Sequence, residues 1–95
     1  MIYQAIVTKF LAPTNTQAGR IKATAAAGSV TVPYDHSLSQ KGNHDVAART
    51  LAEKKEWAGL WIAGGMPGSD GNVYVLIENA TSLPNAIAFS VNAPR

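Results

Sequence analysis

Residues 20–25 alternate strictly between side chains that favour the interior and side chains that favour water. The apolar and polar members of this alternation are Ile21, Ala23 and Ala25 against Arg20, Lys22 and Thr24. Successive side chains of a β-strand point to opposite faces of the sheet. The pattern therefore predicts a strand that buries one face and holds two cations and a hydroxyl together on the other.

Other segments have the composition of strands, rich in β-branched and aromatic residues and bounded by Gly or Pro. The first, residues 2–11, is largely apolar on both faces, which predicts an interior strand covered on both sides. Gly28 suits the turn of a hairpin because glycine readily adopts positive φ. The predicted strands are residues 2–11, 20–25, 30–34, 60–63, 73–77 and 86–91.

Residues 44–57 have the spacing of an amphipathic helix. Asn43 is the predicted N-cap, and Gly59 is predicted to stop the helix. The side chains that fall within one apolar arc are Val46, Ala47, Thr50, Leu51, Trp57 and Ala58. This face is predicted to pack on a sheet.

The element order is β-β-β-α-β-β with one further strand at the end. It predicts an α+β fold, in which an antiparallel sheet of about five or six strands carries one helix on one face. The 95 residues suit a single domain spanning 1–95, with residues 92–95 frayed.

Composition narrows the functional classes. The chain has no cysteine, which excludes disulfides and thiolate metal sites. No apolar run reaches the roughly 18 residues of a membrane span, and residues 1–4 do not resemble a signal peptide, so a cytoplasmic protein is predicted. The net charge is only +2, but the first 34 residues contain Lys9, Arg20 and Lys22 and no acidic residue.

Catalytic and metal-binding motifs are weak. His36 and His44 lie beside Asp35 and Asp45, but their spacing matches no common zinc site, and they are interpreted as surface residues at a helix entry. Neighbouring residues of one loop cannot readily form a serine-protease relay, so Asp35, His36 and Ser37 do not indicate one. Both tryptophans are interpreted as core residues. The predictions are no enzyme, no cofactor and no metal.

The best candidate surface is the polar side of the 20–25 hairpin. Its predicted partner-binding residues are Arg20, Lys22, Thr24, Thr31 and Lys9. Cations grouped in this way suit phosphate or an acidic protein surface. Three charges in 34 residues are also what an ordinary surface carries, and that alternative stays open.

Several stretches together resemble a family of short uncharacterised proteins from bacterial genomes, phages and other mobile elements. They are the run 14–23 with Thr14-Asn15-Thr16 and Arg20-Ile21-Lys22-Ala23, the run Ser29–His36, the segment 47–57, and Gly64-Gly65. The chain differs from the family pattern at Ala18-Gly19, where Gly-Ser is expected, and the tail after Ile77 has no counterpart.

The resemblance implies an accessory role in a mobile element and no established activity. Two non-enzymatic functions follow as expectations. The first is a binding module that contacts the nucleic-acid backbone or inhibits a host nucleoprotein complex, as anti-CRISPR proteins do. The alternative is a structural or assembly protein that self-associates through a sheet edge. A host protein or nucleoprotein complex is the expected partner, no membrane is expected, and a dimer remains open.

Overall fold

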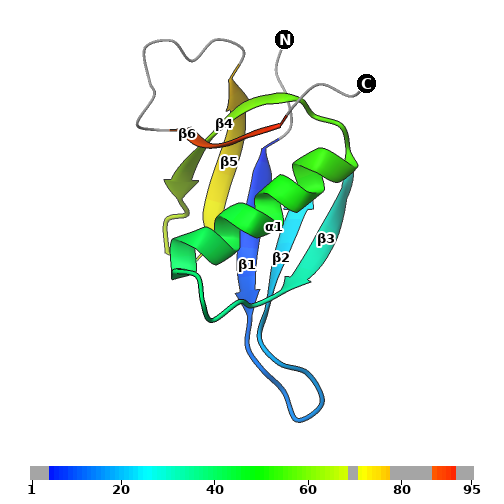
Figure 1. The fold of residues 1–95 in the computed structure, drawn as a ribbon, viewed down its shortest axis with the longest axis vertical. Coiled ribbons are helices and arrows are strands. Elements are labelled where there is room, and N and C mark those ends of the chain that lie inside the picture. The colour runs from blue at the N-terminus through cyan, green and yellow to red at the C-terminus, as the bar shows by residue number, and fades with distance from the viewer. Residues whose placement is uncertain (1–4, 69–70, 78–86, 92–95) are drawn as a thin grey trace.

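The computed structural model describes residues 5–68, 71–77 and 87–91 and has the predicted α+β architecture (Figure 1). Its elements are β1 (Ile6–Leu11), β2 (Arg20–Ala25), β3 (Gly28–Pro33), α1 (Gln40–Lys54), β4 (Gly59–Gly65), β5 (Asn72–Ile77) and β6 (Ile87–Val91). Each predicted strand is therefore present with small shifts of its ends. Residues 2–4 of the first predicted strand and the tail 92–95 lie outside the described residues.

The described strands form one curled antiparallel sheet in the order β3-β2-β1-β5-β4-β6. The helix α1 crosses one side of this sheet, which we call the inner face, and the opposite side is the outer face (Figure 1). Strand β1 lies in the interior of the sheet, between β2 and β5, as predicted. Gly28 has a φ of +150° at the β2–β3 turn, so the predicted role of this glycine is confirmed.

The core lies between α1 and the inner face. Ile6, Ile21 and Trp61 are fully buried on the sheet side, and the Trp61 ring lies 5.9 Å from the ring of Phe89. The buried apolar side chains of α1 are Ala47, Ala48, Leu51 and Ala52. Three of these four side chains are the methyl groups of alanine, so the helix backbone can lie close to the strands.

The helix begins earlier than predicted, and its N-cap is Ser39 rather than Asn43. Ser39 Oγ accepts a hydrogen bond from the Gly42 N–H at 3.0 Å. Asn43 is buried in the first turn, where its Oδ1 accepts from the Asp35 N–H at 2.7 Å and its Nδ2 donates to the Asp35 carbonyl at 2.9 Å. Both residue types suit an N-cap, but Asn43 instead ties the preceding loop to the helix.

The predicted buried face of the helix is correct in part. Ala47 and Leu51 are fully buried as predicted, but Val46 is 44% exposed, and the polar residue His44, outside the predicted arc, is buried. The buried positions advance from 43–44 to 47–48 and 51–52, the spacing of one helix face. The prediction weighted the larger Val46 over Ala48 and Ala52, whose small size is what this interface uses.

The helix also ends earlier than predicted, and Gly59 does not stop it. Glu56 has a φ of +58°, and its N–H donates to the Glu53 carbonyl at 3.1 Å. The Trp57 N–H donates to the Ala52 carbonyl at 2.9 Å, which completes a Schellman motif. Trp57 therefore lies beyond the helix, packed partly buried against the core.

Strand β1 was expected to be covered on both faces, but among the described residues only its inner face is covered. Ile6 and Thr8 are buried on the inner face, whereas Val7 is 36% exposed on the outer face. No described helix or strand packs over that face, so within the described residues α1 is the covering layer of the sheet.

Leu51→Ala should lower the free energy of unfolding by about 2–5 kcal/mol, because the side chain is fully buried between helix and sheet. Val46→Ala, one turn earlier on the exposed side, should change it by less than about 0.5 kcal/mol. Urea denaturation of both variants measures this difference. Equal midpoints would contradict the assigned helix face.

Glu56→Gly should raise the free energy of unfolding by about 0.5–1 kcal/mol. A left-handed conformation costs a residue with a Cβ roughly 1 kcal/mol, and glycine adopts it without that cost. Glu53→Gly, in the helix itself, is the control and should be destabilising by about 1 kcal/mol. A lower thermal midpoint for Glu56→Gly than for wild type would contradict the assigned helix end.

Candidate functional sites

The predicted partner-binding residues lie together on the outer face. Lys9 of β1 is directly opposite Lys22 of β2, and Lys22 is directly opposite Thr31 of β3. Arg20 and Thr24 flank Lys22 on the same side of β2, because side chains of one strand alternate between faces. We call the five residues Lys9, Arg20, Lys22, Thr24 and Thr31 the basic cluster.

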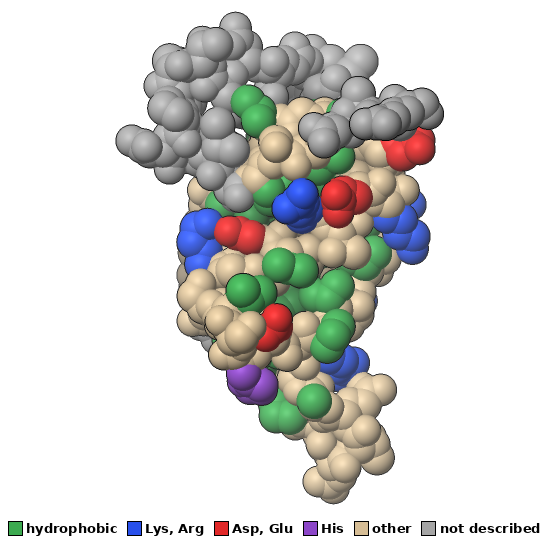
Figure 2. Space-filling model, in the orientation of Figure 1, with side chains coloured by type: hydrophobic (Ala, Val, Ile, Leu, Met, Phe, Trp, Pro, Cys, Tyr) green, Lys and Arg blue, Asp and Glu red, His purple; other side chains and the backbone are tan. Residues whose placement is uncertain are grey.

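Among the described residues, no strand supplies an acid to balance the charges of the basic cluster. No described strand contains Asp or Glu, and the described acidic residues lie in α1 or in the segments flanking it. The ion pairs of the described residues are Lys41–Asp45 and Arg49–Glu53, both on the helix. Figure 2 shows the helix side, where acidic and basic side chains alternate. The basic cluster faces the other way.

An aliphatic strip adjoins the basic cluster on the outer face. Val7 is directly opposite Val73, and Ile62 is directly opposite Val75, which is 41% exposed. The aromatic residues of the described strands occupy inner-face positions instead: Phe10, Trp61, Tyr74 and Phe89. Within the described strands, the outer face therefore combines cations with aliphatic groups and offers no ring for base stacking.

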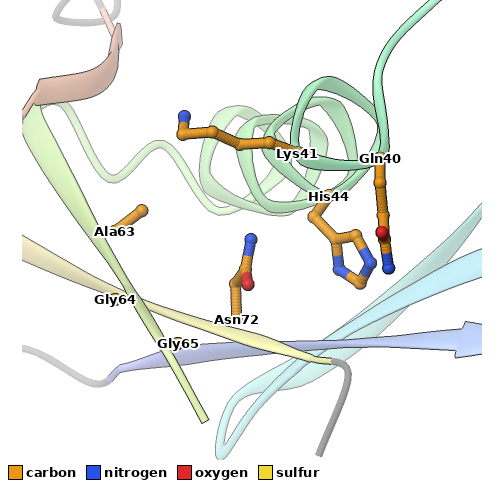
Figure 3. A pocket seen from close by; sticks show the side chains of 7 residues that line it. All are labelled: Gln40, Lys41, His44, Ala63, Gly64, Gly65 and Asn72. Carbon is orange, nitrogen blue, oxygen red and sulfur yellow. The ribbon is translucent and has the colours of Figure 1, made fainter.

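A second candidate site is a polar cavity that the sequence analysis missed. It has a volume of about 390 Å³ and lies between the first two turns of α1 and the ends of β4 and β5 (Figure 3). Gln40, Lys41 and His44 line it from the helix. The residues that line it from the sheet are Ala63, Gly64, Gly65 and Asn72.

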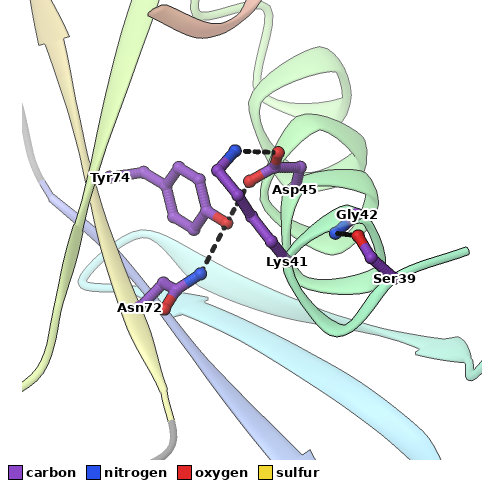
Figure 4. Close-up of polar contacts among 6 residues, drawn as sticks. All are labelled: Ser39, Lys41, Gly42, Asp45, Asn72 and Tyr74. Carbon is purple, nitrogen blue, oxygen red and sulfur yellow. Dashed lines mark hydrogen bonds and ion pairs between the residues drawn. The ribbon is translucent and has the colours of Figure 1, made fainter. Parts of the chain in front are cut away.

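A chain of hydrogen bonds supports the cavity wall (Figure 4). Lys41 Nζ lies 2.6 Å from Asp45 Oδ2, and the Tyr74 hydroxyl donates to Asp45 Oδ1 at 2.5 Å. Asn72 Nδ2 in turn donates to Tyr74 Oη at 3.3 Å. Burial raises the pKa of the Tyr74 hydroxyl well above its ordinary value, and its hydrogen bond to the Asp45 carboxylate raises it further. Tyr74 is therefore a neutral donor at physiological pH.

The two histidines occupy different environments. His44 is buried, contrary to the predicted surface position, and its Nδ1 lies 2.7 Å from Thr8 Oγ1. Thr8 Oγ1 also accepts the Asn72 N–H at 3.1 Å, so it joins β1, β5 and α1. His36 is exposed, with its ring 5.1 Å from the Tyr34 ring. Among the described residues, no three His, Asp or Glu side chains gather as a metal site.

The cavity could not be found from local spacing because its residues come from positions 40–45, 63–65 and 72–74. One signal was available in the strand alternation. Thr8 and Asn72 occupy inner-face positions, next in phase to the buried Ile6 and Tyr74. Polar residues at core positions need hydrogen-bond partners, so such positions mark a buried polar network.

Two of the stretches that carry the family resemblance, 14–23 and 29–36, meet at one end of the sheet. Thr14 Oγ1 accepts the backbone N–H groups of Thr16 and Gln17, and the Tyr34 N–H donates to the Gly19 carbonyl at 3.0 Å. A second cavity, of about 470 Å³, opens there. Its lining is Phe10, Pro13, Ala18, Gly19, Tyr34, His36 and Gln40.

Comparison of the chain with models of protein families, with curated proteins and with solved structures finds no match. The part of the chain that the structure describes contains no helix with the length and apolar character of a membrane span.

The raised pKa of Tyr74 predicts alkaline behaviour. Because the native phenol holds its proton above the ordinary pKa of about 10, native stability is retained below that pH and falls as the pH rises above it. Phenolate absorbance should show one tyrosine that ionises only as the protein unfolds, and Tyr74→Phe should remove this late phase. Its persistence in Tyr74→Phe would show that another tyrosine is responsible.

Proposed function

We propose that the protein is a small non-enzymatic binding module that docks through its outer sheet face on an acidic surface of a protein partner. The observation that carries the proposal is the direct opposition of Lys9 and Lys22 with no acidic residue in any described strand. Like charges directly opposite each other destabilise a sheet. Their pairing without a neighbouring acid is consistent with an external anionic partner.

The aliphatic strip favours a protein over nucleic acid as that partner. Exposed Val7 precedes Lys9 by two residues on the outer face of β1, and exposed Val75 continues the aliphatic strip on β5. This combination suits a surface that presents acidic and aliphatic groups together. The family resemblance adds the biological setting, in which a phage or mobile-element protein inhibits a host nucleoprotein complex. Direct contact with the nucleic-acid backbone is the second candidate, supported by the three cations alone.

Reversal of Arg20 and Lys22 to Glu should abolish partner binding and preserve folding. Lys22 is exposed and Arg20 is half-buried at one end of β2, and neither belongs to the core. Exposed charges contribute little to stability, and Glu at position 22 would face Lys9 as an opposite charge. The matched control reverses Arg49 and Lys54, which gives the same change of net charge on the helix side. Pull-down from bacterial lysate, with and without nuclease, measures binding for each variant.

The outcomes separate the candidate functions. Docking on a protein is supported if wild type captures one protein complex with or without nuclease and the sheet variant, but not the control, fails to capture it. Loss of nucleic acid, with a salt slope of roughly 0.9 per phosphate contact, supports the second candidate. Unchanged partners in the sheet variant would show that the basic cluster is only a solvated surface. A change of oligomeric state in that variant would instead support self-association.

A further inference from the structure

The polar cavity presents an amide whose orientation is determined by its neighbours. The Tyr74 hydroxyl has one proton, and it goes to Asp45 Oδ1 at 2.5 Å. The Tyr74 oxygen must therefore accept the contact from Asn72 at 3.3 Å, which places the nitrogen of the amide beside it. Asn72 keeps its second N–H and its Oδ1, and no described group hydrogen-bonds that oxygen.

The supporting chain holds this amide in place. The Asp45 carboxylate accepts a hydrogen bond from the Tyr74 hydroxyl and forms an ion pair with Lys41 at 2.6 Å. The charges of Asp45 and Lys41 therefore balance each other at the cavity wall. Recognition groups supported in this way by further hydrogen bonds need little reordering when a ligand binds. Gln40 contributes a second side-chain amide to the lining. The lining therefore favours a neutral ligand that both donates and accepts hydrogen bonds.

The wall opposite the helix is nearly free of side chains. Ala63, Gly64 and Gly65 form it, and a Cβ added at Gly65 would meet no atom within 4 Å (Figure 3). Gly65 lies opposite Asn72 in the register, so it faces the same side as that amide. A flat backbone wall beside a directed amide suits a planar ring, and 390 Å³ lies within the range of small-molecule pockets.

We propose that this cavity binds a small planar ring with adjacent hydrogen-bond donor and acceptor groups on its edge, the chemistry of a nucleobase or a carboxamide heterocycle. Asparagine recognises adenine through such a donor–acceptor pair. The site lies on the inner side of the sheet, across it from the basic cluster. It is therefore independent of the proposed docking function.

The experiment is an NMR titration of the full chain, labelled with ¹⁵N, with adenosine, uridine and nicotinamide up to millimolar concentrations. We expect saturable shifts of the Gly65 backbone and Asn72 side-chain signals for at least one probe, and the probe that binds identifies the source of the ring. If that probe is adenosine, purine riboside, which lacks the amino donor, should bind about tenfold more weakly. No saturable shift with any probe would overturn the proposal.

Two valine substitutions provide a comparison. Gly65→Val fills the cavity and should abolish binding. Ser29→Val lies at an exposed outer-face position of β3, outside the cavity lining, and should leave binding unchanged. Equal effects of the two variants would contradict the site. The Arg20→Glu, Lys22→Glu variant should keep its affinity for the ring, which separates this proposal from the docking function.

Tyr74 is a positioning residue in this proposal, so Tyr74→Phe tests it if Gly65→Val does not fold. Without the hydroxyl, nothing holds the Asn72 amide in one orientation. The preference of the site for adenosine over purine riboside should fall from about tenfold to near unity, or the affinity for uridine or nicotinamide should fall about tenfold. An unchanged preference and unchanged affinities would show that Tyr74 has only a structural role.

Discussion

The close packing of one alanine-faced helix on one side of the sheet is the constraint on which the other features depend. A helix of 15 residues cannot cover six strands, and its buried methyl groups bring it close to the strands that it does cross. Where β4 ends in Ala63, Gly64 and Gly65, the sheet has no side chains large enough to reach the helix, and the polar cavity results. The outer face has no covering layer among the described residues, so its alternate side chains define a second surface.

The helix is held by different forces along its length. Its first two turns bury Asn43 and His44, and the partners of Asn43 are backbone groups of the preceding loop, while His44 contacts Thr8. Buried polar groups are tolerated because they are hydrogen-bonded. The later turns bury Leu51 and Ala52 in the apolar core. This polar beginning positions Asp45 beside Tyr74, so the same contacts that begin the helix also build the cavity wall.

The fold class was predictable because strand alternation and chain order are local signals. The alternation of residues 20–25 predicted the face of the sheet on which each side chain lies in the structure. The grouping of Arg20, Lys22 and Thr24 on one face was therefore predictable from the sequence. The helix face was predictable only in part. Spacing placed Leu51 correctly, but Val46 outranks Ala48 on any measure of hydrophobicity although only the smaller residue fits the close interface. The cavity depends on residues 8, 41–45 and 72–74 meeting in three dimensions, and no sequence spacing encodes that meeting. Only the polar inner-face positions of Thr8 and Asn72 hinted at it.

The two candidate sites share strands but not side chains. Because successive residues of a strand point to opposite faces, the Val73 side chain belongs to the outer surface, while Gly65 and Asn72 belong to the cavity. A change at one position therefore leaves the chemistry of the other face in place, provided that the strand pairing is kept. The amide of Asn72 is held by Tyr74 and Asp45 on the inner side of the sheet rather than by residues of the outer face. A ligand in the cavity and a partner on the basic cluster would thus bind without competing for any side chain.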